Sequence, residues 1–588
     1  MAQISGKIFD GKLFSKLMVY VKPFKITYYF VLATAILLSL FSTLTPYLLK
    51  VTVDDYIRPK DYEGMLLFVG FMFGALFLEV LFQFLFVFYA NWLGQRVIKN
   101  LRTDLFQKII LFKMSYFDKT AVGRLVTRAV SDIETIASIF SQGLFMIIAD
   151  LLKMLLVIGV MLYVDWRLTL IVFSILPIIL YATRLFQKSM KKAFEEVRLQ
   201  VANLNSFVQE RISGIKIVQI FHREKIEYDR FVAINEKHKK AWLKTVWFNS
   251  IFFPVAEISS SVTIGLLVWY GGFNVISGGG ISLGTIFLFI QMSQMLFRPL
   301  RQIADKFNTL QMGMVAADRI FKILETDSSI ANKGTHTPDS VKGAITFDQV
   351  HFSYLPDEEV LHGISLQIKA GETVAIVGAT GAGKSTIINL LSRFYEYVSG
   401  DITIDGVSIR SLELTSLRKH VAVVLQDVFL FADSLYNNIT LFNPALTREE
   451  VMQAAKTIGV HEFIASLPGG YDYNVKERGV MLSSGQRQLI AFLRAYIAKP
   501  SILVLDEATS SVDSYTEEII QKAIDKLTAG KTSIVIAHRL ATVKNADRIV
   551  VMDQGTIVEQ GTHEELLKVS NGYYAKLYEV QFAEELAS

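Results

Sequence analysis

The sequence contains no cysteine in its 588 residues. Disulfide bonds, thiolate metal sites and thiol catalysis are therefore excluded for this chain. A natural absence and a deliberate removal of cysteines would leave the same sequence, so the observation does not choose between them. The charge is also nearly balanced, because 60 basic and 55 acidic residues leave a net charge of +5. Nucleic acid binding requires a clustered basic face, so nucleic acid is not expected as a partner.

The N-terminal residues lack the pattern of a cleaved signal peptide, which joins an apolar core to a small-residue cleavage site. Residues 1–25 instead place apolar side chains at helical spacing, with lysines between them. These apolar side chains are Ile8, Phe9, Leu13, Phe14, Leu17 and Met18. The pattern predicts an amphipathic helix on the inner surface of a membrane. An ordinary surface helix is less favoured because a strongly apolar segment follows directly.

Apolar residues make up 52% of the chain, and the mean hydropathy of +0.37 is high for a soluble protein. They gather before about Ile323 in long runs with few charges, and roughly 20 such residues span a bilayer. We therefore predict a six-helix transmembrane domain over residues 26–325. Its spans are expected at about residues 26–54, 64–92, 141–163, 167–187, 248–276 and 283–308.

The links between these spans differ in length and charge. Spans two and three, and spans four and five, are joined by links of tens of residues that are rich in lysine and arginine. The other links are short and carry little positive charge. Because positive loops stay in the cytoplasm, we expect a multi-pass protein of the cell (inner) membrane, with the N-terminus, the long links and the C-terminal half in the cytoplasm.

Residues 326–343 are polar and contain Pro338, which is typical of a linker. From residue 344 to residue 588, short apolar strands alternate with helical stretches. This alternation predicts an α/β domain with a largely parallel sheet. The expected strands are Ile345–Val350, Val374–Val377, Val421–Leu425, Ile502–Leu505 and Ser533–Ile536.

A glycine-rich loop directly follows the second of these strands. We call it the phosphate loop, and it consists of Gly378, Ala379, Thr380, Gly381, Ala382, Gly383, Lys384 and Ser385. A helix-forming run from Thr386 to Leu391 follows the loop. The backbone N–H groups of such a loop, together with the helix N-terminus, bind phosphates. Lys384 is expected to reach the β- and γ-phosphates of a nucleotide, and Ser385 is expected to bind Mg²⁺.

Two acidic residues close the strand Ile502–Leu505. Asp506 is expected to hold Mg²⁺, and Glu507 is the candidate general base that polarises the attacking water. Between the phosphate loop and this strand lies Leu482-Ser483-Ser484-Gly485-Gln486, which we call the signature segment. Along the chain, the phosphate loop comes first, the signature segment second and the strand with its two acids third. Motifs in this order resemble the ATP-binding cassette (ABC) family. Nearly the whole chain resembles an exporter half-transporter of that family, which carries a membrane domain and a nucleotide-binding domain in one chain.

The resemblance implies roles for further residues of the nucleotide site. Tyr354 resembles the aromatic residue that stacks on adenine, and Thr386 extends the ATP-binding loop. Gln426 resembles the glutamine that senses Mg²⁺ and the attacking water. His538 resembles the histidine that contacts the γ-phosphate. The implied cofactors are ATP and Mg²⁺, with Mg²⁺ held by the residues Ser385, Gln426 and Asp506.

The resemblance also implies contacts within and between subunits. Ser511 and Asp513 resemble the loop that crosses from one subunit to the other. Residues 477–479 resemble the exporter segment that contacts the coupling helices. Residues 115–123 and 214–224 resemble those coupling helices, and plain cytoplasmic helical loops are the alternative.

The signature segment implies that the chain works as a dimer. In the family, Ser483 and the amides of Ser484 and Gly485 cap the γ-phosphate that Lys384 of the other subunit binds. A helix is expected to begin near Gln486. Ser484 replaces a glycine that is usual in the family, and the change is small. We favour a homodimer with two active sites, and one subunit of a heterodimeric exporter is the alternative.

Charged residues inside predicted spans suggest function by default. The candidates are Glu79, Asp150, Lys153, Glu257 and Arg298. Asp150 and Lys153 are three residues apart on one helical face, where they are expected to neutralise each other. A lipid A-like flippase would fit the basic Arg298, but the acids of helices two and three weaken that interpretation. The aromatic run near Phe84 suits an amphipathic or cationic hydrophobic cargo, so a multidrug-type exporter is favoured.

The favoured function is an ATP-hydrolysing primary active exporter, a translocase that moves hydrophobic or amphipathic compounds outward by alternating access. Three rival functions fit the sequence less well. A peptide-processing secretion ATPase would need a cysteine protease domain, and this chain has no cysteine. A soluble ABC protein acting on nucleic acid would not carry six spans. For a channel that uses ATP only for opening, Glu507 argues for turnover instead, and it does not exclude gating.

Overall fold

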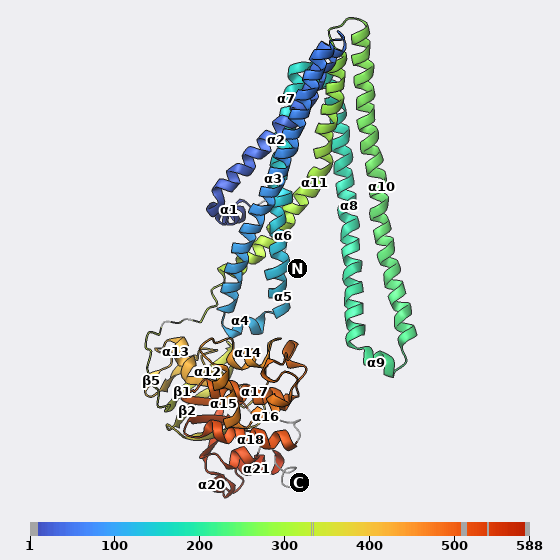
Figure 1. The fold of residues 1–588 in the computed structure, drawn as a ribbon. Coiled ribbons are helices and arrows are strands. Elements are labelled where there is room, and N and C mark those ends of the chain that lie inside the picture. Colours follow the sequence, from blue (N-terminus) through green and yellow to red (C-terminus); the bar gives the residue numbers. More distant parts are fainter. Residues whose placement is uncertain (1–9, 331, 333, 507–513, 538–539, 582–588) are drawn as a thin grey trace. The chain divides into compact units, whose positions relative to one another are not determined.

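The computed structural model describes residues 10–330, 332, 334–506, 514–537 and 540–581. These residues form two compact units (Figure 1). The helical unit contains residues 1–110 and 122–326, and the α/β unit contains residues 111–121 and 327–588. A short piece of the N-terminal half, residues 111–121, therefore belongs to the α/β unit.

Long helices make up the helical unit. They are α2 (Lys25–Val51), α3 (Tyr62–Ile110), α7 (Phe145–Val164), α8 (Trp166–Ser213), α10 (Glu224–Ile276) and α11 (Leu283–Glu325). The shorter helices are α1 (Gly11–Val19), α5 (Val122–Thr127), α6 (Ile133–Ser138) and α9 (Ile215–Ile220). Helices α8 and α10 pack along each other, and α9 connects their ends (Figure 1).

Within the described residues, the predicted amphipathic helix forms as α1, whereas Ile8 and Phe9 of the prediction lie outside them. Leu13 and Leu17 are buried on one face, while Lys12 and Lys16 are exposed on the other. The side chain of Asp10 caps the helix by accepting hydrogen bonds from two backbone amides. The helix therefore has the two-faced character that its sequence predicts, and its place at a membrane surface stays a prediction.

Five helical stretches among the described residues are long and apolar enough to cross a bilayer. They are residues 22–57, 62–110, 122–164, 166–213 and 224–276. In the most apolar 18-residue stretch of residues 62–110, only 6% of the residues are buried inside the structure. The exposed apolar side chains of this stretch therefore need another apolar environment, such as a lipid bilayer. The sixth predicted span forms the 43-residue helix α11, which is not among the five. The count of six spans therefore stays a prediction.

The α/β unit contains two sheets. The larger sheet has the strand order β10-β9-β3-β8-β7-β6, and all of its pairs are parallel except β9 with β10. Its strands are β3 (Thr373–Gly378), β6 (Val421–Val424), β7 (Ile502–Asp506), β8 (Thr532–Ile536), β9 (Arg548–Asp553) and β10 (Thr556–Gly561). This arrangement confirms the predicted α/β architecture.

The assignment of Ile345–Val350 to the parallel sheet was wrong. This segment belongs to β1 in a second sheet with the order β2-β1-β4-β5, and its pairs are antiparallel. The strands are β1 (Ile345–Leu355), β2 (Glu358–Ile368), β4 (Ser399–Ile404) and β5 (Val407–Ser408). The physical reason is the tight turn at Pro356 and Asp357, because a two-residue connection joins only antiparallel strands.

The helices of the α/β unit flank these sheets. They are α4 (Met114–Lys119), α12 (Lys384–Leu391), α13 (Leu414–His420), α14 (Leu435–Thr440), α15 (Arg448–Ile458), α16 (His461–Ser466), α17 (Ser484–Ile497), α18 (Ser514–Thr528), α19 (Leu540–Lys544), α20 (His563–Leu567) and α21 (Tyr573–Gln581). One core packs β1, β2, β4 and α12 against one face of the parallel sheet. A second core packs α14, α15, α17 and α18 with the other face.

Candidate nucleotide site

The phosphate loop joins the buried strand β3 to helix α12. Glycine is required at Gly378, because a Cβ atom there would come within 2.2 Å of the carbonyl oxygen of Met552 on β9. Gly383 adopts the left-handed φ of 97° as the residue that caps α12, a conformation that glycine adopts without strain. The loop therefore brings its backbone N–H groups and the N-terminus of α12 to the end of β3, where an anion is favoured.

Lys384 is the first residue of α12 and is only 9% exposed. Its Nζ donates hydrogen bonds to the carbonyl oxygens of Gly378 at 2.7 Å and Ala379 at 2.9 Å. Burial lowers the pKa of Lys384 below its ordinary value of 10.5, and the Asp506 carboxylate acts in the opposite direction. A buried ammonium that is held by the loop itself is placed to meet a phosphate bound in the loop.

The sheet register aligns the ends of three neighbouring strands. Ile376 of β3 pairs with Ile536 of β8, and Ile536 pairs with Asp506 of β7. Asp506 is therefore in register with Ile376, which lies two residues before Gly378, the first residue of the phosphate loop. Glu507 directly follows Asp506, but it lies outside the described residues. His538, Ser511 and Asp513 lie outside them as well, so the structure places none of these four predicted residues.

Gln426 lies two residues beyond β6, which pairs with β7 along the same edge of the sheet. Its side chain is exposed, as is that of Ser385 at the start of α12. No cluster of three or more His, Asp or Glu side chains suited to a metal occurs in the described residues. A hydroxyl, an amide oxygen and the carboxylate of Asp506 nevertheless fit Mg²⁺, which takes few protein ligands and completes its shell with phosphate and water.

Tyr354 lies near the end of β1 and is 39% exposed. Its hydroxyl shares a 3.3 Å hydrogen bond with Thr386 and accepts another from Asn389 at 3.1 Å. Both partners belong to α12. The aromatic residue expected to hold the base is thus attached to the helix that carries Lys384.

The signature segment forms the start of α17. Ser483 caps the helix by accepting a hydrogen bond from the amide of Gln486, and the side chain of Gln486 accepts one from the amide of Ser483. The helix begins at Ser484, two residues earlier than expected. Ser483 and Ser484 are exposed, while Gly485 is buried. Among the described residues, no hydrogen bond or ion pair joins Ser483 or Gln486 to the phosphate loop of the same chain.

Two contacts of the site were not predicted from the sequence. Arg494 of α17 donates to the carbonyl oxygen of Phe429, three residues beyond Gln426, and to Asn438 of α14. The phenol of Tyr395 donates to the carboxylate of Asp118 on α4. The first contact could have been expected from the sequence, because an arginine on a mostly buried helix needs hydrogen-bond acceptors. The second contact joins residues 277 positions apart and leaves no local pattern.

One ion pair of the helical unit was not predicted. Asp150 of α7 pairs with Lys306 of α11, and Lys153 lies within electrostatic range of Asp150 as well. Lys153 lies within electrostatic range of Glu79 on α3 and of Arg298 on α11.

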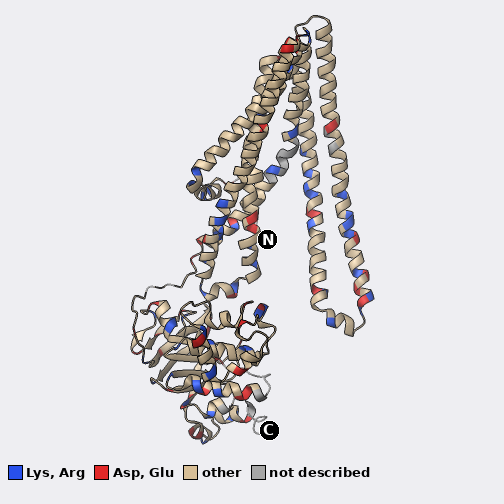
Figure 2. Ribbon diagram, viewed as in Figure 1, with Lys and Arg blue, Asp and Glu red and all other residues tan. Residues whose placement is uncertain are grey.

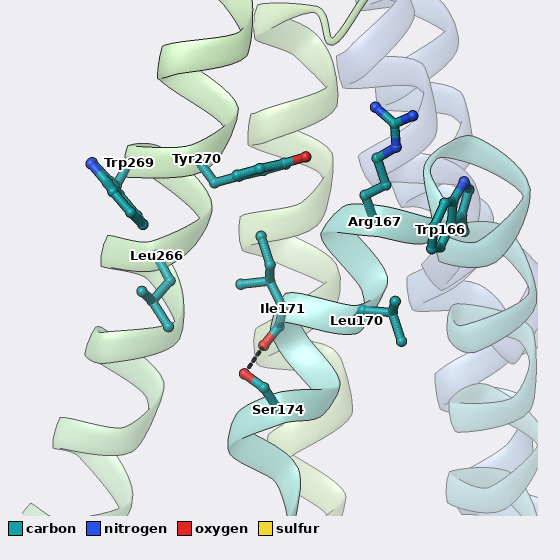
Figure 3. A pocket seen from close by; sticks show the side chains of 8 residues that line it. All are labelled: Trp166, Arg167, Leu170, Ile171, Ser174, Leu266, Trp269 and Tyr270. Atoms are coloured by element: carbon teal, nitrogen blue, oxygen red, sulfur yellow. Dashed lines mark hydrogen bonds between the residues drawn. The ribbon is translucent and has the colours of Figure 1, made fainter.

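A cavity of about 500 Å³ lies between the first turns of α8 and the last turns of α10. It is lined by Trp166, Arg167, Leu170, Ile171, Ser174, Leu266, Trp269 and Tyr270. Figure 3 shows Tyr270 and Ile171 directed into the space between the two helices, with Trp269 and Trp166 at its two sides. The guanidinium of Arg167 lies 5.7 Å from the ring centre of Trp166. Such a mixture of aromatic rings and one cation is typical of the membrane–water interface.

Comparisons with known proteins agree over the whole chain. The model of the ABC transporter transmembrane region matches residues 28–300, and the model named ABC transporter matches residues 361–510. The ABC transporter ATP-binding protein YknV of Bacillus subtilis is 36% identical over 99% of this chain and 96% of its own length. A lipid A-core flippase of Syntrophus aciditrophicus is 37% identical over 84% and 82%. YgaD of Bacillus subtilis, which is named for multidrug export, is 35% identical over 95% and 97%.

Proposed function

We propose a mechanism on the premise that this chain belongs to the ABC transporter family, as the two matched models and the full-length relatives establish. The chain is an ABC exporter, a membrane protein in which an ATP-binding domain drives transport through a helical membrane domain. The proposal concerns the parts that this family membership leaves open: the roles of single residues, the assembly, the orientation and the cargo.

We assign ATP to the phosphate loop, and the buried Lys384 beside Asp506 is the observation that carries this assignment. The Nζ of Lys384 would exchange its two loop carbonyls for phosphate oxygens. Mg²⁺ would be held by Ser385, Gln426 and Asp506, and it would neutralise charge on the phosphates. Glu507 polarises the attacking water as general base, which typically contributes about 10²–10⁴-fold.

The remaining roles concern the base and the γ-phosphate. Tyr354 stacks on the adenine, and His538 contacts the γ-phosphate. Ser511 and Asp513 cross to the second subunit. These roles follow from the resemblance to the family. The sheet register supports those at the strand ends, because β8 pairs with β3, which leads into the phosphate loop, and β7 pairs with β8.

We propose that two copies of this chain form the transporter. Exposed Ser483 and Ser484 at the positive end of α17 offer half of a phosphate site, and the phosphate loop offers the other half. Helix α9 supports the dimer from the helical unit. Ile217 and Phe221 are 64% and 67% exposed in the segment that connects α8 and α10, and Lys216, Arg223 and Glu224 are their charged neighbours in the sequence. Such apolar side chains in water need a protein cover. A heterodimer with a related subunit remains the alternative assembly.

The orientation follows from the distribution of charge. Figure 2 shows that charged residues of α8 and α10 gather in the halves nearest α9, whereas the opposite halves carry few. We therefore place the ends near α9 in the cytoplasm of a cell (inner) membrane protein. The N-terminus and the nucleotide-binding domain lie on the same side.

The proposed cargo is a hydrophobic or amphipathic compound. The cavity between α8 and α10 supports it, because aromatic and aliphatic side chains line most of its wall. A lipid A-like cargo is the second candidate, which the flippase relative favours. Against it, Glu79 on α3 and Asp150 on α7 add two acidic side chains to the predicted spans, and these would repel an anionic lipid headgroup.

Transport in inside-out membrane vesicles tests the proposal. Vesicles with the wild-type protein are expected to accumulate a hydrophobic dye when ATP is added, and Glu507→Gln is expected to abolish accumulation while ATP still binds. Glu518→Gln serves as the matched control, because Glu518 forms only an exposed ion pair with Lys522. Equal accumulation by the Glu507→Gln protein would refute the mechanism.

A further inference from the structure

Helix α4 is anchored to the α/β unit at two points. The amide of Lys113 donates to the carbonyl oxygen of Ser328 at 2.7 Å, and Phe112 pairs with Ser329. At the other end of α4, the carboxylate of Asp118 accepts a hydrogen bond from the Tyr395 hydroxyl. The segment between α3 and α5 is therefore attached to the unit that binds nucleotide, while its two neighbours in sequence belong to the helical unit.

Tyr395 stands on a rigid support in the segment that follows α12, which ends at Leu391. The preceding Arg393 is 3% exposed and donates to the carbonyl oxygens of Ile409 at 3.0 Å and Leu412 at 3.3 Å. Arg393 also forms an ion pair with Glu396. A buried guanidinium with carbonyl and carboxylate partners fixes the backbone on both sides of Tyr395. The phenol ring is therefore positioned by the same segment that ends the phosphate-binding helix.

The ring of Tyr395 meets the ring of Tyr354. Their centres are 5.0 Å apart at an angle of 86°, the edge-to-face arrangement that aromatic pairs prefer. Tyr354 is in turn bonded to Thr386 and Asn389 of α12. An unbroken chain of contacts thus runs from α12 through Tyr354 and Tyr395 to Asp118.

The hydrogen bond to Asp118 persists at physiological pH. Burial and the neighbouring Asp118 carboxylate raise the pKa of Tyr395 well above its ordinary value of 10.0. The phenol therefore keeps its proton and acts as the donor. Because a tyrosine ring has few rotatable bonds, restraint of one ring by a bound base restricts the ring that touches it.

We propose that Tyr395 is a positioning residue that communicates the state of the base-binding Tyr354 to Asp118 on α4, so that the helical unit responds to the base of the nucleotide as well as to its phosphates. The inference rests on the proposed ATP site and deepens it. Coupling of this kind requires that the two states of the ring pair differ in their contact with α4.

Hydrogen exchange of the α4 amides tests the inference without a transport assay. In the full-length Glu507→Gln protein, ATP is expected to slow exchange of residues 114–119, whereas inorganic triphosphate, which lacks a base, is not. Tyr395→Phe, which keeps the ring and removes the donor, is expected to reduce the ATP effect roughly fivefold or more. Tyr397→Phe is the matched control, because its hydroxyl bonds Asp401 within the second sheet and does not reach α4.

Asp118→Asn completes a double-mutant cycle with Tyr395→Phe. If the two residues act through one bond, the double variant is no worse than the more impaired single variant. In vesicles, Tyr395→Phe is expected to lower the amount of dye moved per ATP hydrolysed. An unchanged ratio, additive effects in the cycle, or equal exchange in the Tyr395→Phe and Tyr397→Phe proteins would overturn the inference. Loss of the ATP effect in every variant, with the parent included, would instead refute the ATP site.

Discussion

Ser484 is the residue at which the signature segment departs from its family pattern, and its environment explains why serine is acceptable there. Ser484 is the first residue of α17 and has an ordinary helical backbone, so the conformational freedom of glycine is not needed. Its side chain is exposed, and a serine adds no atoms to the core. The adjacent cap formed by Ser483 and Gln486 is complete. The departure therefore leaves the cap and the first amides of α17 in place, as the proposal of two working sites requires.

Glu372 provides a pH-dependent contribution to stability at the start of the parallel sheet. It accepts hydrogen bonds from Arg548 at 2.8 Å and from the amide of Lys369 at 2.7 Å, and its side chain is 14% exposed. Burial alone would raise the pKa of Glu372. The hydrogen bonds with Arg548 and Lys369 outweigh burial and hold the pKa below its ordinary value of 4.5. A carboxyl group whose pKa is lower in the folded state stabilises the fold above 4.5, and this contribution is lost as the pH falls through the folded pKa.

We expect Glu372→Gln to weaken the pairing of β3 with β9 at pH 7 by about 1–3 kcal/mol, the usual worth of hydrogen bonds to a charged group. The difference from wild type should shrink below pH 4.5, because the wild-type protein then loses the same interaction. Hydrogen exchange of the β3 and β9 amides is the suitable measurement, since all five tryptophans lie before residue 270 and report on the other unit. A difference that stays constant between pH 7 and the acid range would contradict the assignment.

At the scale of elements, the sequence was sufficient wherever a local pattern determined the structure. The helices, the phosphate loop and the parallel strands follow from apolar periodicity and glycine spacing, and α12 begins two residues before the predicted run at Thr386. Long-range pairing was not predictable in the same way. Tyr395 contacts Asp118 across 277 positions, and Asp150 pairs with Lys306 across 156. Such contacts depend on how elements pack, and no residue near them in sequence indicates the partner.

Helix α17 is tied by Arg494 to the segment that follows Gln426. The guanidinium donates to Phe429 and to two oxygens of Asn438, and burial lowers the pKa of Arg494 to about 10. The group therefore stays charged at pH 7, where its hydrogen bonds are of the strong, charge-assisted kind. Through this contact the signature helix is joined to the segment that follows Gln426, the glutamine predicted to sense Mg²⁺ and the attacking water.

We expect Arg494→Met to loosen residues 426–440 by roughly 2–4 kcal/mol, because three oxygens, two of them partly buried, lose their charged donor. Faster hydrogen exchange in that segment, with a lower rate of ATP hydrolysis, is the expected result. Lys522→Met is the matched control, because it removes a cation from an exposed ion pair on α18. Exchange that is the same in the two variants would show that Arg494 does not hold this segment.

At the scale of the whole molecule, each chain carries one phosphate loop and one signature segment. The central question is whether an ATP site combines the loop and the signature segment of the same chain or of two different chains. Two substitutions separate the possibilities. Lys384→Ala removes the phosphate-binding ammonium. Ser484→Glu places a negative charge beside the phosphate, yet an acidic residue in the first turn of α17 favours the helix. Neither change removes a buried apolar contact, so both proteins are expected to fold.

The two substitutions are then combined in purified mixed dimers whose chains carry different tags. With one substitution on each chain, a site shared between chains leaves one intact pair of loop and signature, and roughly half of the wild-type ATP hydrolysis is expected. With both substitutions on one chain beside a wild-type chain, both shared sites are damaged and hydrolysis should fall to background. A site contained within one chain predicts the reverse order, since the wild-type chain alone would then retain its activity. The two arrangements contain identical substitutions, so the difference between their hydrolysis rates reports only on which chain completes the site. If differently tagged copies of this chain do not associate with one another, the heterodimeric assembly is favoured instead.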